Sequence, residues 1–205
     1  MQIRNSERAW GAVQQGFHWI VALAVISQLT VGLIFANLPE NDPRGGTLFG
    51  VHATLGVVIL IVMLARFAWR QTNPVPALPD TLKPYEKRIA LATHWAFYAL
   101  IIGLPLGGYL MVNAHGHAVP FFGVELPVLL PKNEFLGEAF FYLHVGGAFL
   151  LMALILLHVA AALRHEFLLR DNTLRRMTPL PERETEPVGH TSVAERRSTR
   201  SAYRP

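Results

Sequence analysis

The chain has 205 residues, 52% of them hydrophobic, and a mean hydropathy of +0.32, which together exclude an ordinary soluble domain of this size. It contains no cysteine, which excludes disulfides, thiolate-bound metal clusters and thioether attachment of a cofactor. The formal net charge is +4, from 18 Lys and Arg against 14 Asp and Glu.

Four long stretches of the chain carry no Asp, Glu, Lys or Arg. Each contains at least the roughly 20 apolar residues that are needed to cross about 30 Å of hydrocarbon. They predict four membrane-spanning helices, at residues 17–38, 47–66, 89–113 and 139–164. We therefore expect an all-α membrane protein whose helices form one four-helix bundle.

The basic residues are distributed unequally between the two sides of these helices. Sixteen of the 18 lie in the N-terminal segment, the second loop and the C-terminal segment, and the other two are Arg44 and Lys132. Because Lys and Arg are retained on the cytoplasmic side, this pattern predicts that both termini are cytoplasmic. Topology thus accounts for the basic character of the chain, and no nucleic-acid partner is expected.

Two segments outside the helices have distinctive compositions. The third loop, at residues 114–135, is unusually apolar, and we expect it to lie partly in the membrane interface as a lid over the outer end of the bundle. Residues 178–205 are rich in charge, Pro, Ser and Thr, which predicts a disordered cytoplasmic tail after a membrane domain at residues 1–177.

The fourth predicted helix carries two histidines, His144 and His158, fourteen residues apart. Fourteen residues turn a helix through nearly a whole number of turns and rise about 21 Å, so both side chains lie on one face at two depths. An imidazole in hydrocarbon without a partner costs several kcal/mol. Both rings therefore need compensating interactions.

Other histidines lie at the same two depths. His18 in the first helix matches His158 near the cytoplasmic side, and His52 in the second helix matches His144 near the outer side. Two pairs of imidazoles at two depths predict two b-type haems, each held by two histidines in the bundle core. The alternative is that these histidines only form hydrogen bonds between helices.

Several glycines accompany these histidines in the sequence. Glycine lets a wide macrocycle approach the backbone, although membrane helices also use glycine for plain helix contacts. These glycines are Gly50, Gly56, Gly146 and Gly147.

His94 in the third helix lies at the depth of the cytoplasmic pair. We interpret it as a donor to a haem propionate or as part of a quinone site, with a plain hydrogen bond to a neighbouring helix as the alternative. His115 and His117 in the third loop are expected to be solvated or interfacial.

The order of motifs resembles the bacterial cytochrome b561 family over about residues 7–177. The motifs are FHWIVALAVISQLTVGL in the first helix, HATLGVVILIVMLARFAWR in the second, HWAFYALIIGLPLGGYLM in the third, and the two-histidine fourth helix. The resemblance implies a four-helix bundle in the bacterial inner membrane with two b-type haems. It implies His18 and His158 as ligands of the inner haem, and His52 and His144 as ligands of the outer haem.

The same resemblance implies electron transfer linked to the ubiquinone pool, with superoxide as a candidate donor at the outer face. We expect the quinone site near the inner haem, where His94, Arg66 and Arg70 supply hydrogen-bond donors. No catalytic residue is assigned.

Two other functions stay open from the sequence. One is a cytochrome b subunit that docks a hydrogenase or dehydrogenase as its redox partner, and the other is a non-redox haem or metal carrier. The oligomeric state is not indicated.

Overall fold

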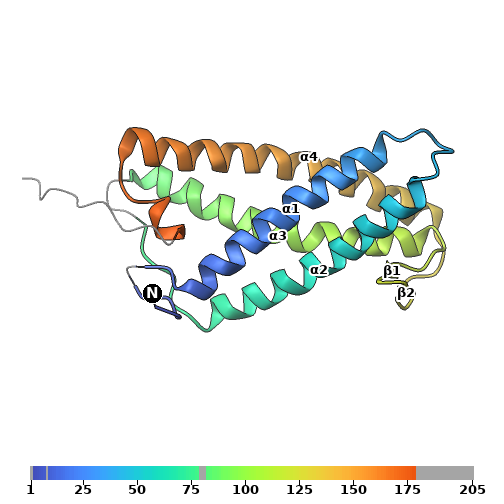
Figure 1. The fold of residues 1–205 in the computed structure, drawn as a ribbon, viewed down its shortest axis with the longest axis horizontal. Helices are drawn as coiled ribbons and strands as arrows, with labels where there is room; N and C mark the ends of the chain where they lie inside the picture. The colour runs from blue at the N-terminus through green and yellow to red at the C-terminus, as the bar shows by residue number, and fades with distance from the viewer. Residues whose placement is uncertain (1, 8, 79–81, 179–205) are drawn as a thin grey trace, which may run out of the picture.

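The computed structural model describes residues 2–7, 9–78 and 82–178, and four long helices dominate this part of the chain (Figure 1). They are α1 (Ala12–Ala36), α2 (Gly45–Gln71), α3 (Pro84–Ala114) and α4 (Glu134–Arg164). The predicted four-helix architecture is confirmed. The predicted disordered tail, apart from its first residue, lies outside the described residues.

Most of the helices extend beyond the predicted spans, because charged residues occupy their ends. Arg70 lies in the last turn of α2, and Glu86 in the first turn of α3 accepts a hydrogen bond from the Lys83 backbone N–H at 2.9 Å. The side chain of Asn133 likewise accepts from Leu136 N–H at the start of α4. Helix ends have unpaired backbone groups that such caps satisfy, so the helices continue past the hydrocarbon into the polar region.

All four helices are long and apolar enough to cross a membrane. Many of their large apolar side chains point outward and are exposed, as in Leu23 of α1 and Leu143 and Leu156 of α4. Such a surface would aggregate in water, whereas it is the expected outer surface of a bundle in lipid. The chain is a membrane protein.

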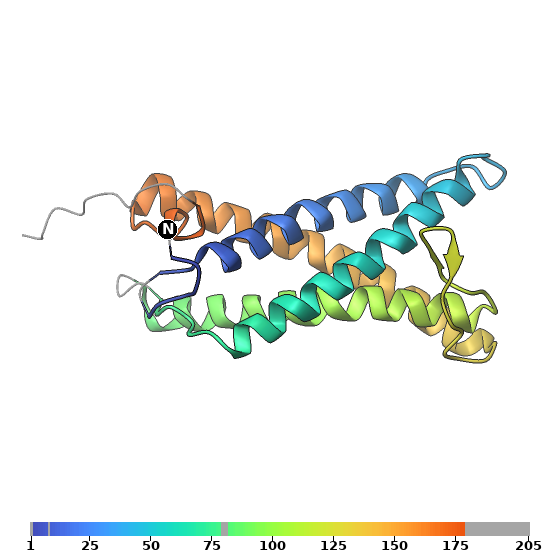
Figure 2. The same ribbon diagram turned by 60° about the horizontal axis from the view of Figure 1, so that its bottom comes forward.

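The bundle has two ends that are named here by what they carry. The terminal end holds the N-terminal segment, the α2–α3 loop and the chain that follows α4, and the hairpin end holds the α1–α2 and α3–α4 loops (Figure 2). In the described residues, close backbone packing joins α1 to α2, α2 to α3 and α3 to α4. By contrast, α4 makes at most slight backbone contact with α1 or α2.

A layer of buried apolar side chains fills the middle of the bundle. All four helices contribute to it, and its fully buried members are Val21, Val25, Ile59, Met63, Tyr98, Ile101 and Leu151. On α4, Leu151 is midway between His144 and His158. The apolar core therefore separates two levels of histidine, one toward each end.

α4 ends at Arg164, as predicted, and the chain then continues into a compact hook that was not predicted. A π-helical turn, His165–Leu169, is followed by Arg170 in the left-handed conformation (φ +53°) and a short 3-10 helix, Arg175–Met177. Trp19 Nε1 donates to the Met177 carbonyl at 2.7 Å. The hook thus joins α1 at the terminal end.

Polar contacts within the hook support its shape. His165 Nδ1 lies 2.6 Å from Asp171 Oδ2, and the Thr173 hydroxyl donates to Asp171 Oδ1. Burial alone would raise the pKa of the Asp171 carboxyl, but the hydrogen bonds from Thr173 and His165 lower it below its usual value. Asp171 is therefore ionised near neutral pH.

The apolar third loop contains a small hairpin that the sequence did not predict. Strands β1 (Pro120–Phe121) and β2 (Val124–Glu125) pair antiparallel. Fully buried Asn113 accepts from Leu129 N–H and donates to the His117 carbonyl, which fixes the two arms of the loop. The third loop is thus an ordered structure, and its hairpin packs beside α2 and does not cover the end of the bundle as a lid.

Candidate functional site

His52 of α2 and His144 of α4 face each other near the hairpin end. Their ring centres are 6.1 Å apart and both residues are half-buried. His144 Nδ1 lies 3.0 Å from the backbone carbonyl of Leu104. A carbonyl only accepts, so Nδ1 carries the proton and Nε2 keeps a lone pair that can bind a metal.

Gln28 of α1 contacts His52 in a different way. Its amide Nε2 donates to the His52 backbone carbonyl at 3.0 Å and lies 3.2 Å from His52 Nε2. An amide nitrogen only donates, so His52 Nε2 accepts this hydrogen bond, and His52 Nδ1 is buried without a hydrogen-bond partner. Gln28 is an amide in the middle of a predicted membrane span, and this was an available signal in the sequence, although no role was predicted for Gln28.

Glycines back both of these imidazoles, but not the glycines that the sequence suggested. A Cβ at Gly32 of α1 would lie 3.0 Å from His52 Cε1, and one at Gly108 of α3 would lie 3.1 Å from His144 Cε1. Of the four glycines that the sequence suggested, a Cβ at Gly50 or Gly146 would meet open space. A Cβ at Gly56 would lie 3.3 Å from Gln28 Nε2, and one at Gly147 would lie 2.7 Å from Leu104 Cδ2, so these two lie against partners of the histidines and not against the rings. The glycines that matter for ring position therefore lie on neighbouring helices, where spacing from the histidine in the sequence gives no signal.

Three histidines meet near the terminal end. The ring of His158 on α4 lies 6.3 Å from His18 of α1 and also 6.3 Å from His94 of α3, measured between ring centres. Trp19 and Phe97 pack edge-on against His18 and His158, respectively. Because the two distances are equal, they do not show which ring would bind the same metal ion as His158.

Helix packing differs between the two pairs. α3 and α4 pack closely, but their tightest approach, where a Cβ at Gly147 would lie 2.7 Å from Leu104 Cδ2, is toward the hairpin end and away from His94 and His158. α1 and α4 make at most slight backbone contact, so His18 and His158 face each other across the wider side of the bundle. The pairing of His18 with His158, with His94 beside the pair, stays a prediction from the sequence.

Arg66 of α2 lies within electrostatic reach of all three of these histidines. Its Nε is buried and has no hydrogen-bond partner, and among the described residues no carboxylate forms an ion pair with it. Its guanidinium carbon lies 5.8 Å from the Tyr98 ring centre, and that of Arg70 lies 5.7 Å from the same ring. Arg66 is half-buried, so its guanidinium can accept an anionic group from outside the chain as a partner.

These observations fit haem. Two imidazoles on opposite sides of one metal ion have ring centres about 6 Å apart, since each metal–nitrogen bond is about 2.0–2.1 Å long. The described residues contain no group of three His, Cys, Asp or Glu side chains that could hold a bare ion. A pair of imidazoles suffices where a porphyrin supplies the other four nitrogens, and its propionates suit Arg66. The assignment of individual ligands stays a prediction.

The two cations at the hairpin end are both close to carboxylates. Arg44 donates to Asp42 through two nitrogens, at 2.9 and 2.7 Å, and Lys132 Nζ lies 3.7 Å from Glu134. The hydrogen bonds from Arg44 lower the pKa of Asp42 to about 2. Asp42 is therefore ionised at any physiological pH, and its negative charge opposes that of Arg44.

An apolar groove of about 240 Å³ lies between α3 and α4 and reaches the ring of His144. Gly103 and Gly107 line it on α3, and Leu143 and Gly147 line it on α4. It is a second place, besides the surroundings of His94, where a flat apolar molecule could approach a histidine pair.

Comparison with known proteins gives a family match over most of the chain. The sequence model of a family described as prokaryotic cytochrome b561 matches residues 9–180.

Individual relatives agree with this match. The chain is 28% identical over 182 residues to "Cytochrome b561 homolog 2" of Escherichia coli (strain K12), covering 86% of this chain and 95% of the relative. It is 29% identical over 172 residues to "Probable superoxide oxidase CybB" of Yersinia pestis, covering 84% of this chain and 97% of the relative. "Cytochrome b561 homolog 1" of Escherichia coli (strain K12) is 24% identical over 162 residues, covering 79% and 92%.

The contact between Gly108 and His144 gives a prediction. Gly108→Leu should displace the His144 ring from Leu104 and lower haem content by the share bound at the hairpin end. Gly107→Leu is the matched control, because a Cβ at Gly107 meets no atom within 4 Å. The haem-to-protein ratio of the purified variants measures this. Equal haem content in both variants would show that Gly108 does not position a ligand.

Proposed function

The chain belongs to the prokaryotic cytochrome b561 family, and on this premise we propose that it is a di-haem carrier that passes electrons between a donor at the hairpin end and the ubiquinone pool. Family membership makes it a membrane cytochrome b that binds haem b and transfers electrons. The finer proposal names two haems, their ligands, the donor and the acceptor.

The observation that carries the proposal is that each of the two α4 histidines faces a histidine of another helix. The ring centres are 6.1 Å apart for His52 and His144 and 6.3 Å apart for His18 and His158. We assign His52 and His144 to one haem, and His18 and His158 to the other. Bound haem iron supplies reversible one-electron chemistry. The protein holds the two ligand levels about 21 Å apart along α4 and keeps water from the layer between them.

We place the hairpin end on the outer side of the inner membrane and the terminal end in the cytoplasm. The concentration of Lys and Arg in the terminal-end segments supports this orientation. The domain is taken as residues 1–177, because the hook up to Met177 packs against α1.

If the two haem sites are separate, each histidine substitution should remove the haem of its own site only. His52→Ala and His144→Ala should each remove one haem, whereas His18→Ala and His158→Ala should remove the other. Reduced-minus-oxidised spectra and haem-to-protein ratios measure which haem is lost. A fully loaded His144→Ala protein with unchanged spectra would disprove the assignment of that ligand.

The quinone site is proposed at the terminal end, beside the His18–His158 pair. His94 is exposed there, and Arg70 lies between the Trp95 and Tyr98 rings at 5.7 Å from each. Imidazole and guanidinium groups can donate to quinone oxygens, and imidazole can also transfer a proton.

His94→Ala should impair quinone reduction in proteoliposomes while both haems stay bound and still accept electrons from a strong reductant. Gly103→Leu, which would fill the groove between α3 and α4, is the matched comparison. If His94→Ala keeps quinone turnover and Gly103→Leu loses it, the groove at His144 is the better site. Loss of haem in His94→Ala would instead identify His94 as a ligand.

Superoxide is proposed as the donor at the hairpin end, and a relative named as a probable superoxide oxidase supports it. An anion must approach an end where five carboxylates outnumber Arg44 and Lys132. We propose that Arg44, close to the α2 end that leads to His52, gives the local attraction when it is free of Asp42.

Asp42→Asn should therefore raise the rate of electron uptake from superoxide at low ionic strength, because it releases the charge of Arg44. The gain should disappear at high salt, where the Debye length falls from about 30 Å at 0.01 M to about 3 Å at 1 M. A neutral reductant serves as the control and should be unaffected. An unchanged superoxide rate at low salt would argue against attraction of an anion at this end.

A further inference from the structure

The turn of the β1–β2 hairpin has an unusual residue at its tip. Phe122 has φ +49° and Gly123 has φ +85°, so both central residues of the turn lie in the left-handed region. Turns of this kind favour Asn-Gly or Gly-Gly, and a bulky residue with positive φ is an outlier. An aromatic side chain is thus held at the tip against the local conformational preference.

The hairpin and the segment after it present apolar side chains to the outside. Phe122 is 74% exposed, and Val124, Val128 and Leu129 are each more than half exposed. Glu125 is the only charged residue between 118 and 131. The Leu129 N–H donates to Asn113 of α3, which holds the segment in one position on the bundle. These side chains are therefore exposed in an ordered segment.

The hairpin lies beside α2 rather than beyond its end. The Thr54 hydroxyl is 3.5 Å from the Pro120 carbonyl, and Thr54 is nine residues, or about 13 Å, along the helix from Gly45. α2 is about 40 Å long, so about 5 Å at each end extends past a hydrocarbon layer about 30 Å thick. The base of the hairpin therefore lies at or below the membrane boundary.

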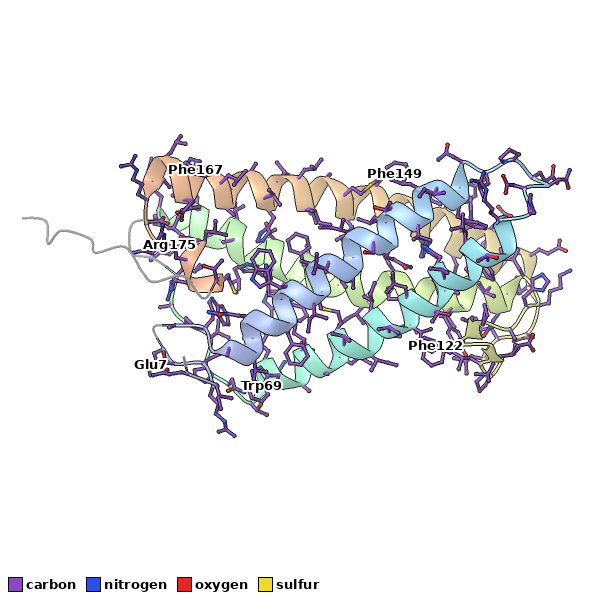
Figure 3. The ribbon with its side chains drawn as sticks, in the orientation of Figure 1. Glu7, Trp69, Phe122, Phe149, Phe167 and Arg175 are labelled. Atoms are coloured by element: carbon purple, nitrogen blue, oxygen red, sulfur yellow. The ribbon has the colours of Figure 1, made fainter. Side chains whose placement is uncertain are left out.

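The figures show where the hairpin lies on the bundle. In Figures 1 and 2 it lies on the flank of the bundle near the ends of α2 and α3, and it does not project past the α1–α2 loop. Figure 3 shows Phe122 on this flank, away from the helices.

We propose that the hairpin, residues 119–126, inserts into the lipid interface, with Phe122 at the boundary between headgroups and acyl chains. Aromatic side chains are enriched at this depth, and the surface beside a membrane-spanning helix is occupied by lipid. A soluble protein that docks on the end of the bundle would not cover this flank. The proposal does not depend on the redox function.

The absence of cysteine makes a direct test possible, because a single introduced cysteine is the only labelling site. Phe122→Cys with a nitroxide label is reconstituted in phosphatidylcholine vesicles, and Asn41→Cys, exposed in the α1–α2 loop, is the control. The label at 122 should collide severalfold more with oxygen than with a water-soluble nickel complex, and the label at 41 should show the opposite. Equal nickel accessibility at both positions would overturn the proposal, as would protection at 122 in native membranes but not in vesicles, which indicates a protein partner.

A second variant separates the lipid contact from the turn. Phe122→Asn creates the Asn-Gly sequence that this turn prefers, so the hairpin is retained while its apolar tip is lost. A nitroxide at Val124→Cys should lie deeper in the membrane with Phe122 present than in the Phe122→Asn background. The same depth in both backgrounds would show that Phe122 does not anchor the hairpin.

Discussion

The structure depends on one constraint, that an imidazole within a membrane needs a partner for its polar atoms. His144 Nδ1 meets a backbone carbonyl on α3 and His52 Nε2 meets Gln28 on α1, whereas His52 Nδ1 has no hydrogen-bond partner and the rings near the terminal end face one another. These contacts require close approach of neighbouring helices, which Gly32 and Gly108 permit. The demand of a few polar rings therefore determines where helices come close and where they stay apart.

The distribution of close packing follows from this requirement. α3 and α4 pack closely against each other, whereas α4 stays apart from α1 and α2, which carry the rings that face it. Space is therefore kept between the helices whose histidines form pairs. The apolar layer around Leu151 and Met63 closes the middle of the bundle and keeps the two levels independent.

The sequence was sufficient for features that depend on chain length and helical repeat. Charge-free stretches gave four spans, and the spacing of His144 and His158 gave two levels, because both follow from the geometry of a single helix. The roles of Gly108 and Gln28 could not be assigned in this way, since they arise where two helices meet. The hook after Arg164 depends on contacts with α1, which no local pattern reports.

The spacing of the two histidine levels also has an electrical consequence. The levels are about 21 Å apart along α4, roughly two-thirds of a hydrocarbon layer of about 30 Å. Moving one elementary charge across the whole layer changes its electrostatic energy by about 2.3 kcal/mol for each 100 mV of membrane potential. With a haem at each level, as proposed, an electron that moves between the levels would exchange about 1.6 kcal/mol for each 100 mV, so the membrane voltage would shift the distribution of electrons between the two ends of the bundle.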